Sequence, residues 1–201
     1  SSVEVLSTSN ASGTTFTVNQ SDLSSGGTVI GSSTTDTLRT VDTQLDLSST
    51  TLSSVEVLST SNASGTTFTV NQADLSSGGS VLGSGGTDIL RAADTQLDLS
   101  STTLSSIEVL STSNAGGTRF TVNQDDLSSG GSVLGSNGTD ILRAADTQLD
   151  LSSTTLSSIE VLSTSNSNAT TFTVNQGDLA SGGSVLGSNG TDILRAADTQ
   201  L

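Results

Sequence analysis

The sequence repeats itself every 52 residues, with no insertion or deletion between copies. The hexapeptide at residues 1–6, Ser-Ser-Val-Glu-Val-Leu, returns at residues 53–58 and, with Ile in place of the first Val, at residues 105–110 and 157–162. So strict a period is typical of stacked repeat architectures, in which each unit contacts only its neighbours. We therefore expect one continuous solenoid of four repeats, at residues 1–52, 53–104, 105–156 and 157–201, the last one truncated.

The composition allows only a thin core. The 201 residues include no Cys, Met, Trp, Tyr, His or Pro and only four Phe, and 31% are hydrophobic. Ordinary soluble domains contain about 45–50% apolar residues. A polar composition can indicate disorder. Because Val, Ile, Leu and Phe recur at fixed places in every copy, we favour an ordered chain with narrow apolar stripes instead.

The charge restricts the partners. Twenty acidic residues face five basic ones, and the net charge is −15. No basic patch is available to neutralise phosphates, so we expect no nucleic-acid partner. No apolar run reaches the roughly 20 residues of a membrane span, so we expect no membrane insertion. Divalent cations are the natural counterparts of such an acidic chain.

Within each repeat the local period is two, as in half-buried strands. Phe16 and Val18 alternate with Thr15 and Thr17, and Gly-Ser clusters mark corners. The segments 120–148 and 149–171 resemble each other, and together they make up one repeat. These features predict an all-β chain, a parallel β-solenoid or β-helix, in which each repeat makes two coils, one of about 29 and one of about 23 residues, and the chain makes about eight coils.

Stacking every second coil in register would place equivalent residues above one another. It predicts an interior aromatic column beside ladders of Asn and Gln, whose amides would bond along the stack. The column would consist of Phe16, Phe68, Phe120 and Phe172, and the ladders of Asn19, Asn71, Asn123 and Asn175 with Gln20, Gln72, Gln124 and Gln176.

A glycine-rich motif recurs once per repeat. Residues 135–143 read Gly-Ser-Asn-Gly-Thr-Asp-Ile-Leu-Arg, and related stretches occupy residues 31–39, 83–91 and 187–195. The motif resembles the RTX nonapeptide, G-G-x-G-x-D-x-U-x, of secreted calcium-binding proteins. The resemblance implies calcium as a cofactor, with Asp36, Asp88, Asp140 and Asp192 as the metal positions. The alternative is a glycine-rich turn whose Asp caps backbone amides.

The resemblance extends along the whole chain. The stretch 149–162, followed by a Gly-Thr-Asp-x-Leu loop, is similar to the repeat regions of large bacterial RTX-like (hemolysin-type calcium-binding) surface and adhesin proteins. This resemblance implies a bacterial protein that is secreted by a type I system and is extracellular or located at the cell surface.

The remaining acids recur in repeat-matched sets, which could suggest a catalytic carboxylate pair. Enzymes rarely duplicate an active site along a chain, and the sequence has no His, Cys or Tyr for other acid–base chemistry. We therefore expect no enzyme, and interpret the acids as a solvated surface. The sets are Glu4, Glu56, Glu108 and Glu160; Asp22, Asp74, Asp126 and Asp178; Asp42, Asp94, Asp146 and Asp198; and Asp46, Asp98 and Asp150.

The sequence thus predicts a structural extracellular protein, a solenoid segment of a stalk, fibre, filament or surface layer. The alternative is a calcium-dependent adhesin or binding module for carbohydrate or ice. Ser1 begins a repeat and Leu201 ends inside one, so we expect an excerpt of a longer array. Its expected partners are copies of itself or further repeats of the same chain, stacked end to end.

Overall fold

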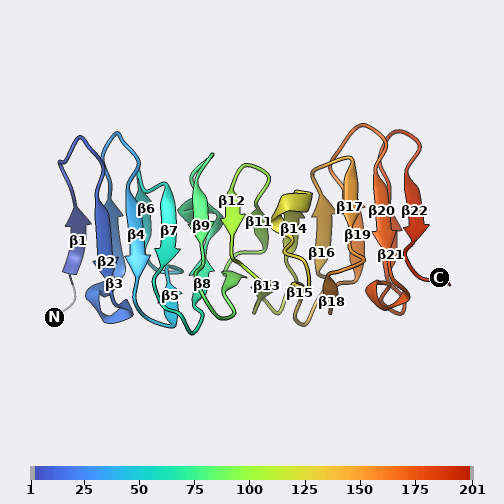
Figure 1. The fold of residues 1–201 in the computed structure, drawn as a ribbon, viewed down its shortest axis with the longest axis horizontal. Coiled ribbons are helices and arrows are strands. Elements are labelled where there is room, and N and C mark those ends of the chain that lie inside the picture. The colour runs from blue at the N-terminus through green and yellow to red at the C-terminus, as the bar shows by residue number, and fades with distance from the viewer. Residues whose placement is uncertain (1–2, 200–201) are drawn as a thin grey trace. The chain divides into compact units, whose positions relative to one another are not determined.

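The computed structural model describes residues 3–199 as short β-strands connected by tight corners, with single 3-10 turns at four of the corners (Figure 1). Strands that hydrogen-bond to each other run parallel and belong to successive coils. The chain is therefore a parallel β-solenoid, as the sequence predicts. Ser1 and Leu201, the expected open ends of the repeat array, lie outside the described residues.

The coils form two compact units, one of Ser1–Ala93 with Ser101–Ile107, the other of Asp94–Ser100 with Glu108–Leu201. In the first unit, three sheets have the strand orders β1-β3-β6, β2-β4-β7-β9-β12 and β5-β8-β10. In the second unit, the orders are β13-β15-β18, β11-β14-β16-β19-β21 and β17-β20-β22. In each unit, three sheets enclose one apolar core.

The elements of the first unit have the following bounds: β1 Val3–Ser7, β2 Thr15–Val18, η1 Gln20–Asp22, β3 Leu23–Ile30, β4 Thr37–Thr40, β5 Gln44–Asp46, β6 Thr51–Ser53, β7 Val57–Thr60, β8 Thr67–Val70, η2 Gln72–Asp74, β9 Ser80–Leu82, β10 Ile89–Ala92 and β12 Thr103–Ser105. Those of the second are β11 Gln96–Asp98, β13 Val109–Thr112, β14 Arg119–Val122, η3 Gln124–Asp126, β15 Ser132–Leu134, β16 Ile141–Ala144, β17 Gln148–Asp150, β18 Thr155–Ser157, β19 Val161–Thr164, β20 Thr171–Val174, η4 Gln176–Asp178, β21 Ser184–Leu186 and β22 Ile193–Ala196.

Each complete repeat contains seven segments, namely six strands and one 3-10 turn. One coil of the solenoid contains three segments. Each segment pairs with the third segment after it, as β16 does with β19. Along one column, Leu97 pairs with Phe120, Phe120 pairs with Leu142, and Leu142 pairs with Leu162. A repeat therefore makes two and one third coils, each of about 22 residues.

This register corrects the expected division of each repeat into one longer and one shorter coil. The shorter length is right, because Leu149 pairs with Phe172, but no strand pair of the described residues spans as much chain as the longer coil requires. Residues 141–144, which lie inside the expected longer coil, form β16, a strand with its own place between β14 and β19. The similarity between residues 120–148 and 149–171 therefore indicates strands of similar shape, and it does not place these strands in the same sheet.

The predicted phenylalanine column is wrong for the same reason. The extra third of a coil moves each equivalent position to the next sheet, so β2 and β8 lie in different sheets of the first unit, and β14 and β20 in different sheets of the second. Phe68 is flanked by Leu45 and Leu90 instead. The prediction that these rings are interior is confirmed, since Phe68, Phe120 and Phe172 are 0–1% exposed.

Leucine, valine and alanine fill the rest of each core, because alternate residues of every strand point inward. In β16, Leu142 and Ala144 are fully buried, while Ile141 and Arg143 lie on the outer surface. Within residues 3–199, no helix is long and apolar enough to cross a membrane.

Candidate functional site: buried carboxylates at the corners

The aspartates of the glycine-rich motif lie inside the corners. Asp36, Asp88 and Asp140 are fully buried, and Asp192, near the end of the described chain, is partly exposed. In the third repeat, the Asp140 carboxylate accepts the backbone N–H of Thr118 at 2.7 Å and that of Ser136 at 2.8 Å. Thr118 belongs to the preceding coil, so this carboxylate joins two layers of the solenoid.

The same aspartate also contacts the following coil. The backbone N–H of Asp140 donates to a carboxylate oxygen of Glu160 at 2.8 Å, and the Glu160 N–H donates to the Asp140 carbonyl at 3.0 Å. Each such corner therefore connects three successive coils. The first repeat has the same arrangement, with Asp36 bonded to Thr14, Ser32 and Glu56.

The first glycine of the motif is required by the coil above. A Cβ atom on Gly135 would lie 1.8 Å from the carbonyl oxygen of Ser158 and 2.8 Å from the Asp140 carboxylate. Ser158 itself has a left-handed backbone, with φ of 53°. The spacing of Gly and Asp in the motif thus follows from a close approach of two coils at this corner.

The hydrogen bonds at the first of these corners favour the ionised form of Asp36. The hydrogen bond from the Ser32 N–H is the main cause that lowers the pKa of Asp36 below its usual value, and it outweighs the opposing effect of burial. The donors around this carboxylate are the N–H groups of Thr14 and Ser32 and the Ser32 hydroxyl. These are the bonds expected of the alternative interpretation, an Asp that caps backbone amides.

The four motif aspartates are not brought together with other carboxylates into a cage. Calcium takes six to eight oxygen ligands. Within residues 3–199, no group of three or more His, Cys, Asp or Glu side chains has a geometry that could hold a metal ion.

A second set of acids, expected to be solvated, is buried at the 3-10 turns. Asp74, Asp126 and Asp178 are only 5–6% exposed. The Asp126 carboxylate accepts the N–H of Asn123 at 2.7 Å, which closes a capping box around η3. The interpretation of the remaining acids as a solvated surface is therefore wrong for Asp74, Asp126 and Asp178, because the corners leave N–H groups without strand partners and these carboxylates bind them.

The Asn and Gln side chains bond to backbone rather than to one another, so the predicted amide ladders are also wrong. Asn123 donates to the Ser100 carbonyl at 3.0 Å. The Gln124 amide accepts the Asp150 N–H at 2.6 Å and donates to the Asp150 carbonyl at 3.1 Å. The glutamine side chain thereby acts as an additional strand residue for the next coil.

An acidic groove borders this glutamine in the second unit. Its volume is about 570 Å³, and it contains the Asp146 and Asp150 carboxylates. Burial first, and then the charges of Asp125, Asp146 and Asp98, raise the pKa of the nearby Asp126 to about 7. The groove is lined by Gln124, Asp146, Thr147, Gln148, Asp150, Ser152 and Ser153.

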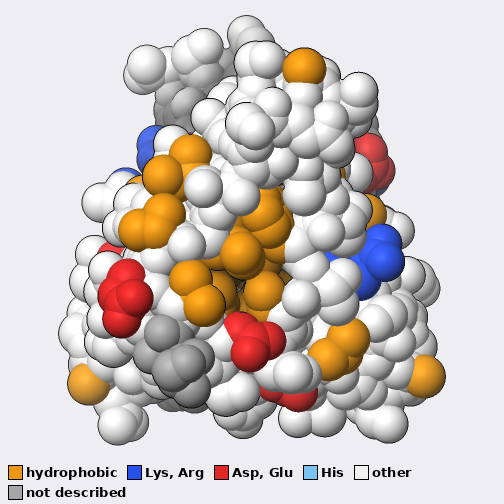
Figure 2. Space-filling model, turned by 90° about the vertical axis from the view of Figure 1, so that its left-hand side faces the viewer, with side chains coloured by type: hydrophobic (Ala, Val, Ile, Leu, Met, Phe, Trp, Pro, Cys, Tyr) orange, Lys and Arg blue, Asp and Glu red, His pale blue; other side chains and the backbone are white. Residues whose placement is uncertain are grey.

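The terminal strands expose apolar side chains. At the N-terminal end of the first unit, Val3 and Val5 are 50% and 55% exposed, and Figure 2 shows apolar side chains gathered at this end beside acidic ones. A hollow of about 340 Å³ lies there between Val3, Phe16 and Asp22. Strands β1 and β2 are the outermost strands of their sheets.

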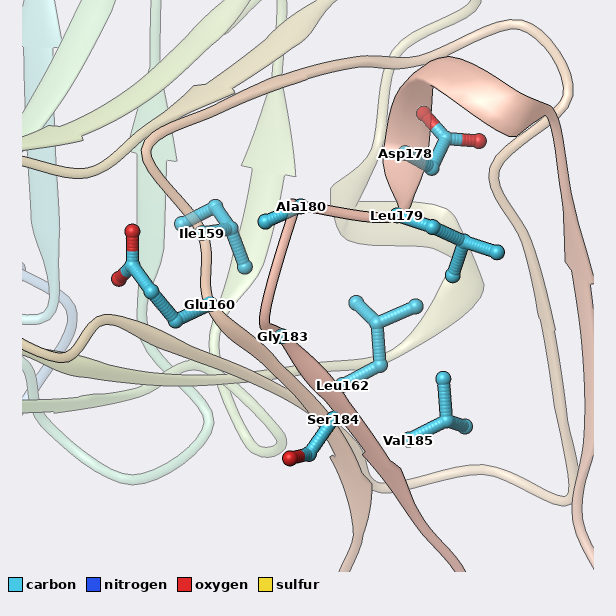
Figure 3. A pocket seen from close by; sticks show the side chains of 9 residues that line it. All are labelled: Ile159, Glu160, Leu162, Asp178, Leu179, Ala180, Gly183, Ser184 and Val185. Carbon is cyan, nitrogen blue, oxygen red and sulfur yellow. The ribbon is translucent and has the colours of Figure 1, made fainter.

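The C-terminal end of the second unit has a smaller cavity, of about 160 Å³. Figure 3 shows Leu162, Leu179 and Val185 around it, while the Glu160 carboxylate points away. Strand β21 is the last strand of its sheet, and Leu186 is 53% exposed. Both ends thus combine an unpaired strand edge with an apolar surface.

Neither a known family, nor a curated protein, nor a solved structure matches this chain. The fold and the corner carboxylates define its class. It is a β-solenoid repeat protein whose recurrent side-chain clusters connect one coil to the next.

Proposed function

We propose that this chain is a non-catalytic, structural extracellular protein, a solenoid segment of a stalk, fibre, filament or surface layer. The single observation that carries the proposal is the corner at which Asp140 bonds to Thr118, Ser136 and Glu160. At this corner the most distinctive residues of the repeat hold three coils together. Such residues resist separation of the coils along the stack, which is the direction in which a solenoid under tension is stretched.

The acidic composition supports an extracellular, hydrated role. The net charge of −15 and the acids that remain exposed keep the outer surface hydrated and repel other copies at low ionic strength. The resemblance of the glycine-rich motif to secreted calcium-binding repeats points in the same direction. We propose location outside the cell or at its surface, and fractionation of the cells that make the chain tests this location directly.

The partner that best fits the ends is a further coil of the same repeat, from the same chain or a second copy. Both terminal edges present unpaired strands with exposed apolar residues such as Val5 and Leu186. A parallel strand of the same repeat would pair with each edge and cover these side chains. A head-to-tail contact of this kind that does not close generates a filament.

Light scattering and negative-stain imaging across ionic strength test this association. The Debye length falls from about 10 Å at 0.1 M salt to about 3 Å at 1 M, so added sodium chloride is expected to promote end-to-end association. A chain that stays monomeric at every salt concentration would argue against self-association. It would leave contact with further repeats of one longer chain as the way in which the ends are covered.

Calcium is proposed as a cofactor only at the motif aspartates. Titration calorimetry tests this proposal. Calcium chloride is compared with sodium chloride at matched ionic strength, for the parent chain and for a variant in which Asp88, Asp140 and Asp192 are changed to Asn. A calcium-specific heat in titration calorimetry that disappears in the variant supports the calcium-dependent binding module. A heat that persists places calcium elsewhere.

A further inference from the structure

We propose that Asn137 and, more slowly, Asn189 are sites of spontaneous deamidation in the folded chain. Both residues precede a glycine, in the loops Asn137-Gly138 and Asn189-Gly190. The corresponding positions of the first two repeats, Ser33 and Gly85, have no side-chain amide. The modification would therefore be confined to the third and fourth repeats.

The reaction needs an asparagine side chain and a following backbone nitrogen that are both accessible. Asn137 and Gly138 are exposed, and neither the Asn137 carboxamide nor the Gly138 N–H makes a hydrogen bond within residues 3–199. Glycine has no Cβ, so nothing on the attacked side hinders approach of its nitrogen to the Asn137 side chain.

The preceding coil lies close to the glycine next to this asparagine. Gly138 has a φ of 115°, and a Cβ on it would lie 2.6 Å from the Gly117 nitrogen and 2.8 Å from the Ala115 carbonyl of the preceding coil. The equivalent positions of the second and fourth repeats are also glycines, Gly86 and Gly190, whereas the first repeat has Thr34. The close approach of the two corners therefore favours glycine after Asn137 in the third repeat.

A neighbouring serine distinguishes the two sites. The single hydrogen of the Ser136 hydroxyl is shared between the Asn114 carbonyl at 2.6 Å and, as the weaker branch, the Asn137 carbonyl at 3.3 Å. A donor on that carbonyl withdraws electrons from the Asn137–Gly138 amide and makes the Gly138 N–H more acidic. The equivalent Ser188 bonds to the Asn166 and Asn168 carbonyls instead, so Asn189 lacks this activation.

The chemistry uses no reagent other than water. The Gly138 nitrogen attacks the Asn137 Cγ, a C–N bond forms, and the bond from Cγ to Nδ2 breaks. The hydrogen of the Gly138 N–H leaves with Nδ2 as ammonia, and the product is a cyclic succinimide. Water then opens either C–N bond of the ring, which yields aspartate or, with one more carbon in the main chain, isoaspartate.

The product would affect the corner described above. The Thr139 carbonyl lies against Gly117 of the preceding coil, and Asp140 follows directly. A longer main chain at residue 137 shifts these atoms and weakens the bond from Thr118 to Asp140. Each event also adds one negative charge to a chain that already carries −15. Deamidation would therefore loosen the third repeat as the protein ages.

The test is incubation of the folded chain in mildly alkaline buffer, followed by proteolysis and tandem mass spectrometry. We expect a gain of one mass unit at Asn137 first and Asn189 second. Asn123 and Asn175 are internal controls, because their amides donate to the Ser100 and Ser152 carbonyls and a glutamine follows each. Equal modification at these controls, or none at Asn137 in the folded chain, would overturn the proposal.

Matched variants separate chemistry from folding. Asn137→Gly gives the third loop the sequence of the second, Gly83-Ser84-Gly85-Gly86-Thr87-Asp88, which folds in its own repeat. The unfolding midpoint of this variant should fall less during incubation than that of the parent chain, because only Asn189 remains to react. Ser136→Ala should slow modification at Asn137, and Ser188→Ala should leave Asn189 unchanged. Faster modification at Asn189 than at Asn137 in the parent chain would contradict the role of Ser136.

Discussion

The carboxylate of Asp140 accepts a hydrogen bond of 2.7 Å from the backbone N–H of Thr118, a residue of the preceding coil. The bond exists because the chain between the two residues completes one turn of the solenoid. The bond is a regular feature of the repeat. It recurs between Asp36 and Thr14, between Asp88 and Thr66, and between Asp192 and Thr170.

Replacement of Asp140 by Ala should destabilise the chain even in the presence of a calcium chelator. The change leaves the Thr118 and Ser136 N–H groups buried or half-buried without an acceptor, and each such donor costs about 1–3 kcal/mol. Urea unfolding measures the loss. Asp192→Ala, at a partly exposed corner, is the matched control and should cost less. A loss seen only when calcium is present would show that the aspartate acts through a metal ion instead.

Replacement of Gly135 by Ala should also destabilise the chain. The new Cβ would lie 1.8 Å from the Ser158 carbonyl, so the coil above must shift, at a cost of about 1–3 kcal/mol or more. Gly116→Ala is the control, since a Cβ there meets no atom within 4 Å. Thermal unfolding of both variants checks the prediction. Similar midpoints for the two would mean that the close approach of the coils is not maintained in solution.

Replacement of Ser128 by Ala should stabilise the chain. The Ser128 hydroxyl is buried without a hydrogen-bond partner, and the fourth repeat has Ala180 at the equivalent position. Removal of an unsatisfied buried hydroxyl is expected to gain about 1 kcal/mol. A higher urea midpoint than that of the parent chain is the expected result. The reverse change, Ala180→Ser, should not raise the midpoint, and a drop in the Ser128→Ala variant would indicate a partner for the hydroxyl.

Protonation of Asp126 should make stability depend on pH near neutrality. Burial first, and then the charge of Asp125, raise the pKa of Asp126 from 3.8 to about 7 in the folded chain. The folded state thus binds the proton more tightly than the unfolded state, and this contribution to stability is fully present below about pH 4 and lost as pH rises through 7.

The Asp126→Asn variant tests this contribution, because it keeps an oxygen for the Asn123 N–H and cannot ionise. It should be more stable than the parent chain at pH 8, with the difference shrinking as the pH falls toward 5. Asp125→Ala, which reproduces the Ala73 of the second repeat, should weaken the pH dependence without abolishing it. A parent chain whose unfolding midpoint rises between pH 5 and pH 8 relative to Asp126→Asn would contradict the raised pKa.

The sequence alone determined the class of fold. The 52-residue period shows that equivalent residues have equivalent surroundings, and the alternation of Phe120 and Val122 with polar residues gives strands with an inner and an outer side. Local sterics and the burial of apolar side chains decide both features, so a single chain reveals them. The interior position of the phenylalanines followed from the same pattern.

The tertiary structure decided which residues become neighbours. Closure of a coil depends on how many segments fit around the core. Because a coil has three segments and a repeat has seven, Phe120 lies beside Leu142, and its equivalent Phe172 lies in a different sheet. The period alone cannot reveal this, because it relates equivalent residues and not adjacent ones. The same closure buries Asp140 between three coils and presses Gly135 against Ser158, so a motif that resembles a calcium loop forms a hydrogen-bonded corner.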